Sequence, residues 1–240
     1  MQLRTVALVG ADGVGKTTLA KRLCAELGAG ARYVYLGSNP TAATHLLPTT
    51  RAWLRLRALL GQDAHHSGPP APRHRRVRPT NPLRRLGQHL KSLLSLAMRV
   101  SEECHRFVVV AVLARRGYLT ILDRHPYPDY YADHVAGLKG WRRWGDRIHG
   151  YLLERVYPRP DAVLVLDAPA EVLLARKNEG SLEALEARRC EYREVASRFG
   201  GLVVVVDATA AEDEVLASLR GALSWALAEP TPARPAPATR

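Results

Sequence analysis

The sequence predicts an α/β fold in which a five-stranded parallel sheet has helices on both faces. Five short runs rich in Val and Leu alternate along the chain with segments of helical periodicity. The runs are almost continuously apolar, which is typical of parallel strands buried on both faces. Hydrophobic residues make up 47% of the chain and aromatic residues only 6%, so we expect a core built mainly from Val, Leu and Ala.

The boundaries of these elements follow from apolar spacing and from Gly and polar stops. The predicted strands are residues 3–9, 32–36, 118–122, 162–166 and 202–206. The predicted helices are residues 15–27, 50–60, 83–116, 141–157, 170–176, 182–199 and 212–227. The longest of these helices, 83–116, is compatible with one internal break. Ligands of open parallel sheets bind at the carboxyl ends of strands, where Gly10, Asp123 and Asp167 fall.

We expect one domain over residues 1–228, because only one internal stretch lacks large apolar residues. That stretch, residues 61–82, is rich in Pro, Arg and His and is expected to be a mobile basic insertion. Residues 229–240 are rich in Pro and Ala and are expected to form a disordered tail.

The chain is basic, with a formal net charge of +12. Residues 51–91 contain ten basic residues and one acid and so account for most of that charge. Binding of nucleic acid through this segment stays open, beside a solvated loop or a funnel for substrate phosphate.

The cysteines and the apolar runs bear on where the protein works. Three cysteines without paired spacing fit neither a disulfide framework nor a zinc site. The sequence has no signal-peptide layout and no apolar run of membrane-spanning length. We therefore expect a soluble, cytoplasmic protein that does not contact a membrane.

Residues 10–17 match the pattern G-x-x-x-x-G-K-[ST] in full, between a predicted strand and a predicted helix. Backbone N–H groups of such a loop point at phosphate oxygens, and the helix start adds partial positive charge. Lys16 is expected at the terminal phosphates of ATP, and Thr17 is expected to hold Mg²⁺. The alternative is a tight glycine turn without a ligand. The predicted nucleotide-binding residues are Gly10, Ala11, Asp12, Gly13, Val14, Gly15, Lys16, Thr17 and Thr18.

An Asp-Arg pair, Asp123 and Arg124, follows the third predicted strand. In a parallel sheet this position lies beside the phosphate loop, so Asp123 is expected to provide a second contact to Mg²⁺. Arg124 is then expected to face the acceptor. A helix cap or a surface ion pair is the alternative reading.

Together, the phosphate loop, the Asp123-Arg124 pair and residues 158–172 and 175–179 resemble thymidylate kinases and related P-loop nucleoside monophosphate kinases. The resemblance covers most of the chain apart from about residues 41–83 and the tail. It implies a P-loop NTPase fold and an ATP-dependent kinase that uses Mg²⁺. It also implies that Asp12 contacts the acceptor's sugar hydroxyl and that Arg124 grips the acceptor's phosphate.

The resemblance further implies a lid at about residues 176–189, whose basic residues close over the transferring phosphoryl group. Arg176 and Lys177 match the start of this lid, and Arg176 is the predicted catalytic residue among them. Arg188 and Arg189 also supply positive charge. For these two, the alternative is a solvated helix surface on which neighbouring glutamates pair with them.

The acceptor implied by the resemblance is a nucleoside monophosphate such as dTMP. However, the family's phenylalanine and Asp-Arg pair before the third strand are missing, and in the nearest stretch, residues 93–99, only Arg99 matches. The Ser that usually follows Asp-Arg-Tyr is missing as well. A nucleoside or non-nucleotide acceptor therefore stays open, as does a nucleotide-dependent regulatory or nucleic-acid-binding protein.

Two further expectations concern surfaces. The polar and aromatic residues between His125 and His134 form either an acceptor pocket or a surface loop pinned by tyrosines. Dimerisation is common in the family that the chain resembles, and the long helix that begins at Leu83 is the expected contact for a homodimer.

Overall fold

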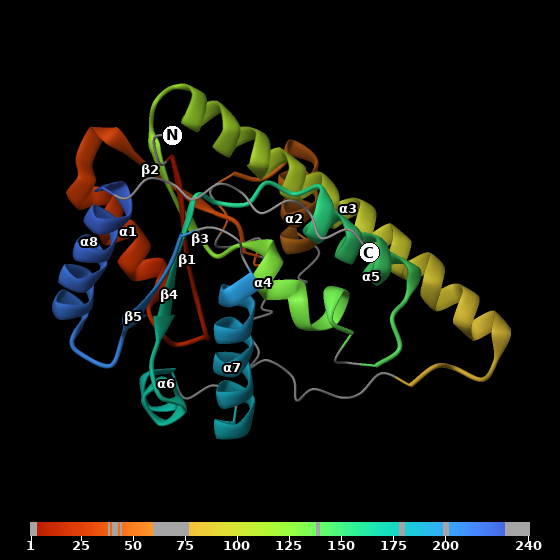
Figure 1. Ribbon diagram of the computed structural model, residues 1–240. Coiled ribbons are helices and arrows are strands. Elements are labelled where there is room, and N and C mark those ends of the chain that lie inside the picture. Colours follow the sequence, from red (N-terminus) through yellow and green to blue (C-terminus); the bar gives the residue numbers. More distant parts are fainter. Residues whose placement is uncertain are drawn as a thin grey trace.

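Five parallel strands form the centre of the protein in a computed structural model that describes residues 4–37, 39, 43, 45–59, 77–137, 140–177, 181–198 and 202–228 (Figure 1). The strands are β1 (Thr5–Gly10), β2 (Ala31–Tyr35), β3 (Leu119–Asp123), β4 (Ala162–Asp167) and β5 (Leu202–Asp207). Their order across the sheet is β2-β3-β1-β4-β5, and every pair is parallel. The predicted α/β class and parallel sheet are thus confirmed.

Helices cover both faces of this sheet (Figure 1). They are α1 (Lys16–Leu27), α2 (Pro48–Leu59), α3 (Pro82–Arg115), α4 (Pro126–Tyr130), α5 (Trp144–Arg155), α6 (Ala170–Lys177), α7 (Leu182–Arg198) and α8 (Glu212–Ala228). A 3₁₀ turn, η1 (Gly28–Gly30), follows α1, and a π-helical turn, η2 (Tyr131–Val135), follows α4. No described helix is both long enough and apolar enough to cross a lipid bilayer.

The core has two halves because alternate residues of a strand point to opposite faces of the sheet. On β1, Val6 and Leu8 pack with apolar side chains of α1 and α8, whereas Ala7 and Val9 pack with side chains of α3, α5 and α7. All four of these β1 residues are buried. The central strand is therefore held on both sides, which keeps its carboxyl end in a defined place.

Helix α3 is continuous over its 34 residues, so the internal break compatible with the sequence does not occur. Its start is well defined, because the Asn81 side chain accepts hydrogen bonds from the backbone N–H groups of Leu83 and Arg84. Pro82 occupies the first turn, where a missing N–H does no harm.

Of the predicted insertion 61–82, residues 61–76 lie outside the described residues, as does the predicted tail 229–240.

Residues 126–135 are helical, so the surface-loop alternative for the segment 125–134 is wrong, whereas the acceptor-pocket alternative stays a prediction. The His125 Nδ1 atom accepts a hydrogen bond from the Tyr127 backbone N–H at 3.2 Å and so caps α4. His125, Tyr127, Tyr131 and His134 are all buried. The physical reason is that the tyrosine rings join the apolar core under the sheet, which outweighs the local preference of Pro and Asp for turns.

Candidate active site

The phosphate loop leaves the sheet at Gly10, the last residue of β1. Gly10 has a φ of 150°, and a Cβ atom at this position would lie 2.3 Å from the Leu166 carbonyl oxygen of β4. Only glycine allows this close approach of the two backbones. The loop then passes directly into α1, which begins at Lys16. The amides of the loop and the first turn of α1 therefore face the same space at the carboxyl edge of the sheet.

The Lys16 side chain lies within this loop and is only 4% exposed. Its Nζ atom donates hydrogen bonds to the carbonyl oxygens of Gly10 and Ala11 at 2.8 and 2.7 Å, and it lies 3.8 Å from Asp12 Oδ1. Burial, together with the nearby Arg124 guanidinium, lowers the pKa of Lys16 to about 8. A buried ammonium group of this kind gains stability when an anion such as a polyphosphate approaches it.

Asp123 lies beside the loop, as the sequence predicts for a metal ligand. Its Oδ2 atom accepts hydrogen bonds from the Thr17 hydroxyl at 2.7 Å and the Tyr33 hydroxyl at 2.8 Å. Its Oδ1 atom is buried and has no hydrogen-bond partner among the described residues. Burial and the neighbouring carboxylate raise the pKa of Tyr33, so its hydroxyl remains a proton donor.

These oxygen atoms fit Mg²⁺. A hydroxyl and a carboxylate lie in contact, and the carboxylate has one buried oxygen that needs a partner. Mg²⁺ prefers oxygen ligands and completes its shell with water and substrate phosphates. Within the described part of the chain, no three His, Cys, Asp or Glu side chains gather into a metal site. Thr17 and Asp123 would therefore hold Mg²⁺ together with a bound phosphate chain.

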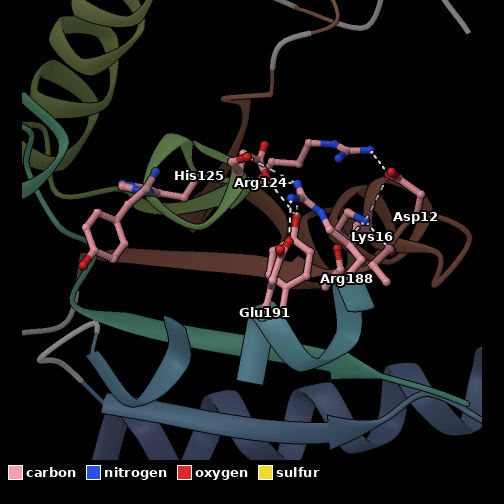
Figure 2. Close-up of polar contacts among 11 residues, drawn as sticks. Asp12, Lys16, Arg124, His125, Arg188 and Glu191 are labelled. Atoms are coloured by element: carbon pink, nitrogen blue, oxygen red, sulfur yellow. Dashed lines mark hydrogen bonds and ion pairs between the residues drawn. The ribbon is translucent and has the colours of Figure 1, made fainter. Parts of the chain in front are cut away.

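Arg124 reaches from the end of β3 to the phosphate loop (Figure 2). Its Nη2 atom donates to Asp12 Oδ1 at 2.8 Å. Arg124 has a φ of 71°, and its backbone N–H donates to the Leu8 carbonyl oxygen at 3.0 Å. A positive φ is strained for a residue with a side chain, and such strain is concentrated at functional sites. The backbone geometry thus turns the guanidinium toward the loop.

Asp12 carries a full negative charge in this setting. Burial by itself raises the pKa of the carboxyl group, but the Lys16 ammonium and the Arg124 guanidinium lower it to about 2. The structure therefore brings together the three predicted residues Asp12, Lys16 and Arg124 as one charged cluster. Oppositely charged groups hold one another in place and leave both cations directed at the same space.

Helix α7 brings a second guanidinium to this cluster, as Figure 2 shows. Arg188 Nη1 donates to Glu191 at 3.2 Å, and its Nη2 atom lies 3.9 Å from Asp129 Oδ1. Asp129 also accepts a hydrogen bond from the Tyr192 hydroxyl at 2.7 Å, so α7 is held against α4. Arg188 helps to stabilise the charged form of Asp12 through the electrostatic field. It is therefore part of the site, although the sequence left its role open.

Arg176 lies elsewhere. Its guanidinium donates to the carbonyl oxygens of Ala208, Thr209 and Ala210 in the loop between β5 and α8. The structure does not bring Arg176 to the charged cluster, whereas the adjacent Lys177 packs beside Gly13 of the phosphate loop. A direct role for Arg176 at a transferring phosphoryl group requires that it leave these carbonyl groups.

Arg189 and Asp167 form an ion pair that the sequence did not predict. Arg189 donates to both carboxylate oxygens of Asp167, at 2.9 and 3.1 Å, and to Glu186 at 2.7 Å. Arg193 also contacts Asp167. Burial raises the pKa of Asp167, but the bonds from Arg189 and Arg193 lower it more, so the net shift is downward. These arginines thus anchor α7 to the end of β4.

A row of buried polar side chains, called here the buried polar row, runs from Glu103 through His149 and His134 to Asp146. Sequence reasoning did not predict these contacts. Glu103 Oε2 accepts hydrogen bonds from the Tyr157 hydroxyl at 2.6 Å and contacts His149 Nε2 at 2.9 Å. His149 Nδ1 lies 2.7 Å from His134 Nδ1, and His134 Nε2 lies 3.4 Å from Asp146. The residues come from α3, α5, η2 and the turn after α5, so no local spacing in the sequence marks them.

Two arginines of α3 complete the surroundings. Arg106 is 5% exposed and donates to the Gly37 carbonyl oxygen at 2.7 Å, which ties the segment after β2 to α3. Arg99, the one residue that matches the family in this helix, lies over the Tyr130 ring at 4.6 Å. Sequence reasoning named Arg99 but had no signal for Arg106, because its partner lies 69 residues away.

Comparisons with known proteins agree with this geometry. A thymidylate kinase from Xanthomonas euvesicatoria pv. vesicatoria is 29% identical over 232 residues, which is 93% of this chain and 84% of that protein. A thymidylate kinase from Xanthomonas oryzae pv. oryzae is 30% identical over 238 residues, with the same two shares. No protein-family model matches the chain. The likeness thus extends far beyond the phosphate loop.

Proposed function

Because the chain belongs to the thymidylate kinase family, we propose that it transfers the γ-phosphoryl group of ATP to a nucleoside monophosphate such as dTMP. The observation that carries this proposal is the convergence of two pairs at the carboxyl edge of the sheet. Thr17 meets Asp123, and Arg124 meets Asp12, on either side of the buried Lys16. The proposal agrees with the names of the two Xanthomonas relatives.

On the donor side, the loop amides and the start of α1 bind the phosphate chain of ATP. The Lys16 ammonium neutralises charge on the terminal phosphates, and Thr17 and Asp123, which are hydrogen-bonded to each other, would hold Mg²⁺. When bound, Mg²⁺ would neutralise charge on the phosphates. The chain itself needs little covalent chemistry, because phosphoryl transfer depends mainly on positioning and charge.

On the acceptor side, Arg124 binds the acceptor's phosphate and Asp12 orients the acceptor's sugar hydroxyl. Asp12 is ionised and within hydrogen-bond distance of Arg124, so it holds the guanidinium in position before the acceptor arrives. Arg188 approaches the same cluster from α7 and stabilises the charge that spreads over the moving phosphoryl group. Arg176 takes part only if closure of the lid frees it from its carbonyl partners.

A second candidate acceptor, a nucleoside or non-nucleotide molecule, is favoured by residues 93–99 of α3, where only Arg99 matches the family. No phenylalanine is present at the corresponding stretch of α3 to stack on a base. Both candidate acceptors require the same binding of ATP by the phosphate loop.

An acceptor screen tests the proposal. The full-length protein is incubated with ATP and Mg²⁺ and with one acceptor at a time, and ADP release is measured. We expect dTMP or a related nucleoside monophosphate to stimulate release, and Lys16→Ala to abolish it. Stimulation only by nucleosides or sugars selects the second candidate. Absence of acceptor-dependent release with every acceptor contradicts both candidates, and so does full activity of Lys16→Ala.

A further inference from the structure

A pocket of about 410 Å³ lies between the first turns of α3 and the start of α5, and none of its lining residues belongs to the site described above. Its size is within the range of small-molecule sites. Among the described residues that line it are four arginines, two from the α3 side and two from the α5 side, and no acid. They are Arg78, Arg85, Arg142 and Arg147.

The charge of this pocket is largely uncompensated. Arg78, Arg85 and Arg147 form no ion pair with any described residue, and Arg142 donates only to backbone carbonyl oxygens of His134 and Val135. From residue 77 to residue 101, the chain contains no acid. Guanidinium groups that line one pocket repel one another, so an anion that enters the pocket gains their combined attraction.

Aromatic rings form the rest of the wall. His89 stacks on Trp144 with ring centroids 4.3 Å apart and meets Trp141 edge-on at 5.2 Å. Trp144 is 46% exposed, so part of its ring remains open to a ligand. Burial and the surrounding Arg85, Arg147 and Arg78 lower the pKa of His89, and its ring is therefore neutral near pH 7. Flat, partly exposed rings beside guanidinium groups are typical of surfaces that bind nucleotides by stacking.

The two helices that form the walls are joined by direct contacts. The Trp144 backbone N–H donates to His89 Nδ1 at 3.1 Å, and the Gly145 N–H donates to Ser92 Oγ at 3.2 Å. A Cβ atom on Gly145 would lie 2.4 Å from the Ser92 carbonyl oxygen, so only glycine lets α5 approach α3 this closely. These contacts hold the start of α5 against α3, and with it the His89 and Trp144 rings.

We infer that this pocket binds a nucleotide unit, with the base against the indole rings and the phosphate on the guanidinium groups of Arg85 and Arg147. A free anion would use the arginines alone, and an uncharged ring would use only the tryptophans. A nucleotide uses both. The unit comes either from a free nucleotide or from single-stranded nucleic acid. The inference does not rest on the proposed function, because its residues lie outside the kinase site.

Two fluorescent probes separate these sources, each tested on the full-length protein. One is a labelled oligothymidylate of about twelve nucleotides, a length within the usual range of single-strand sites. The other is an N-methylanthraniloyl-ATP, used in the Lys16→Ala background so that the phosphate loop contributes little. Binding is measured by fluorescence anisotropy at several salt concentrations.

The variants are a double substitution, Arg85→Ala with Arg147→Ala, and the control Arg84→Ala. Arg84 is the neighbour of Arg85 on α3 and is exposed, but it does not line the pocket. We expect the double variant to weaken binding at least tenfold and to lower the salt slope by about one per arginine removed. Arg84→Ala is expected to change binding by less than about twofold.

An abasic oligonucleotide of equal length shows whether the rings matter. Loss of base stacking is expected to weaken its binding to the wild-type protein by about tenfold, a measurement that needs no variant. Pocket-dependent binding of the oligothymidylate identifies single-stranded nucleic acid, and pocket-dependent binding of the ATP analogue alone identifies a free nucleotide. The inference is overturned if neither probe binds at physiological salt, if the abasic strand binds as well as an oligothymidylate that binds through the pocket, or if Arg84→Ala weakens binding as much as the double variant.

Discussion

Arg124 donates to Asp12 at 2.8 Å across 112 residues of sequence and adopts a φ of 71° where it does so. The contact joins the end of β3 to the phosphate loop, so the groups proposed to bind the acceptor and the donor form one unit. The left-handed backbone is maintained because the Arg124 N–H is held by Leu8 of β1. The strain and the ion pair therefore have separate effects that substitution can distinguish.

We predict that Arg124→Ala and Arg124→Gly both lower kcat/KM for the acceptor by about a hundredfold, because each removes a charged hydrogen-bond donor. Their stabilities should differ. Glycine adopts a positive φ without strain. The free energy of unfolding of Arg124→Gly should therefore exceed that of Arg124→Ala by about 1 kcal/mol. Steady-state kinetics and urea denaturation check the two effects. Equal stability of the variants would argue against the strained backbone.

The lowered pKa of Lys16 predicts a pH dependence of ATP use. Above about pH 8 the free enzyme loses the Lys16 proton, so kcat/KM for ATP should fall about tenfold per pH unit. Bound phosphates favour the protonated form, and kcat at saturating ATP should therefore decline only at higher pH. A profile in which kcat/KM stays level to pH 9.5 contradicts the assignment.

The lowered pKa of Lys16 also makes the free energy of unfolding depend on pH. Between pH 8 and the ordinary lysine pKa of 10.5, the unfolded chain retains the Lys16 proton while the folded chain has released it. The unfolded state then binds more protons, so the free energy of unfolding should rise with pH in this window. Lys16→Met lacks the group, and the difference between wild type and Lys16→Met isolates the effect from other titrations. A difference that does not change from pH 8 to 10.5 counts against it.

Removal of the metal-binding oxygens should change the Mg²⁺ requirement. Asp123→Asn removes the carboxylate whose Oδ1 atom is buried without a partner, and Thr17→Val removes the hydroxyl beside it. We expect each to lower kcat by about a hundredfold or more and to raise the Mg²⁺ concentration needed for half-maximal activity. Thr17→Ser keeps the hydroxyl and is expected to retain most activity. Chelation by EDTA should abolish turnover of the wild type.

The buried polar row predicts a large loss of stability in one variant. Glu103→Leu leaves the Tyr157 hydroxyl and the His149 ring without their shared partner, both of them buried. We expect a loss of about 3 kcal/mol in the free energy of unfolding, measured by urea denaturation. Glu154→Gln, on the exposed face of α5, serves as the control and should change stability by less than about 0.5 kcal/mol.

Helix α3 exposes a row of apolar side chains at four-residue spacing: Leu86, Leu90, Leu94 and Met98. Residues at this spacing share one face of a helix, and this face fits the expected contact between two copies of the chain. We predict that Leu90→Glu with Leu94→Glu converts a homodimer into a monomer, as measured by light scattering during gel filtration. A wild-type protein that is monomeric at all concentrations contradicts the expectation.

Local patterns accounted for much of the fold. The predicted strands agree with β1 to β5 within two residues at each end, because burial on both faces leaves an apolar run that is visible in the sequence. The phosphate loop could be identified from the sequence because its residues are contiguous. The sequence left segment 125–134 open between an acceptor pocket and a surface loop, because Pro and Asp are turn residues locally, and only packing of the tyrosines shows that residues 126–135 are helical.

The remainder of the site depends on distant contacts. Glu103 meets His149 across 46 residues, and Arg106 meets Gly37 across 69. No spacing rule links such positions, because the path of the chain between them sets the distance. Arg176 illustrates the same limit, since the sequence places it in a lid but not against the carbonyl groups that it contacts.

The sequence by itself determined the parallel α/β architecture, the phosphate loop with Lys16 and Thr17, and the candidate partners Asp123 and Arg124. These follow from hydrophobic periodicity and contiguous residue types, which act over a few residues. Only the tertiary structure decided which charges meet: Arg124 with Asp12, Arg188 near them, and four arginines around two tryptophans between α3 and α5. Electrostatic attraction and stacking depend on distance in space, and folding alone sets that distance.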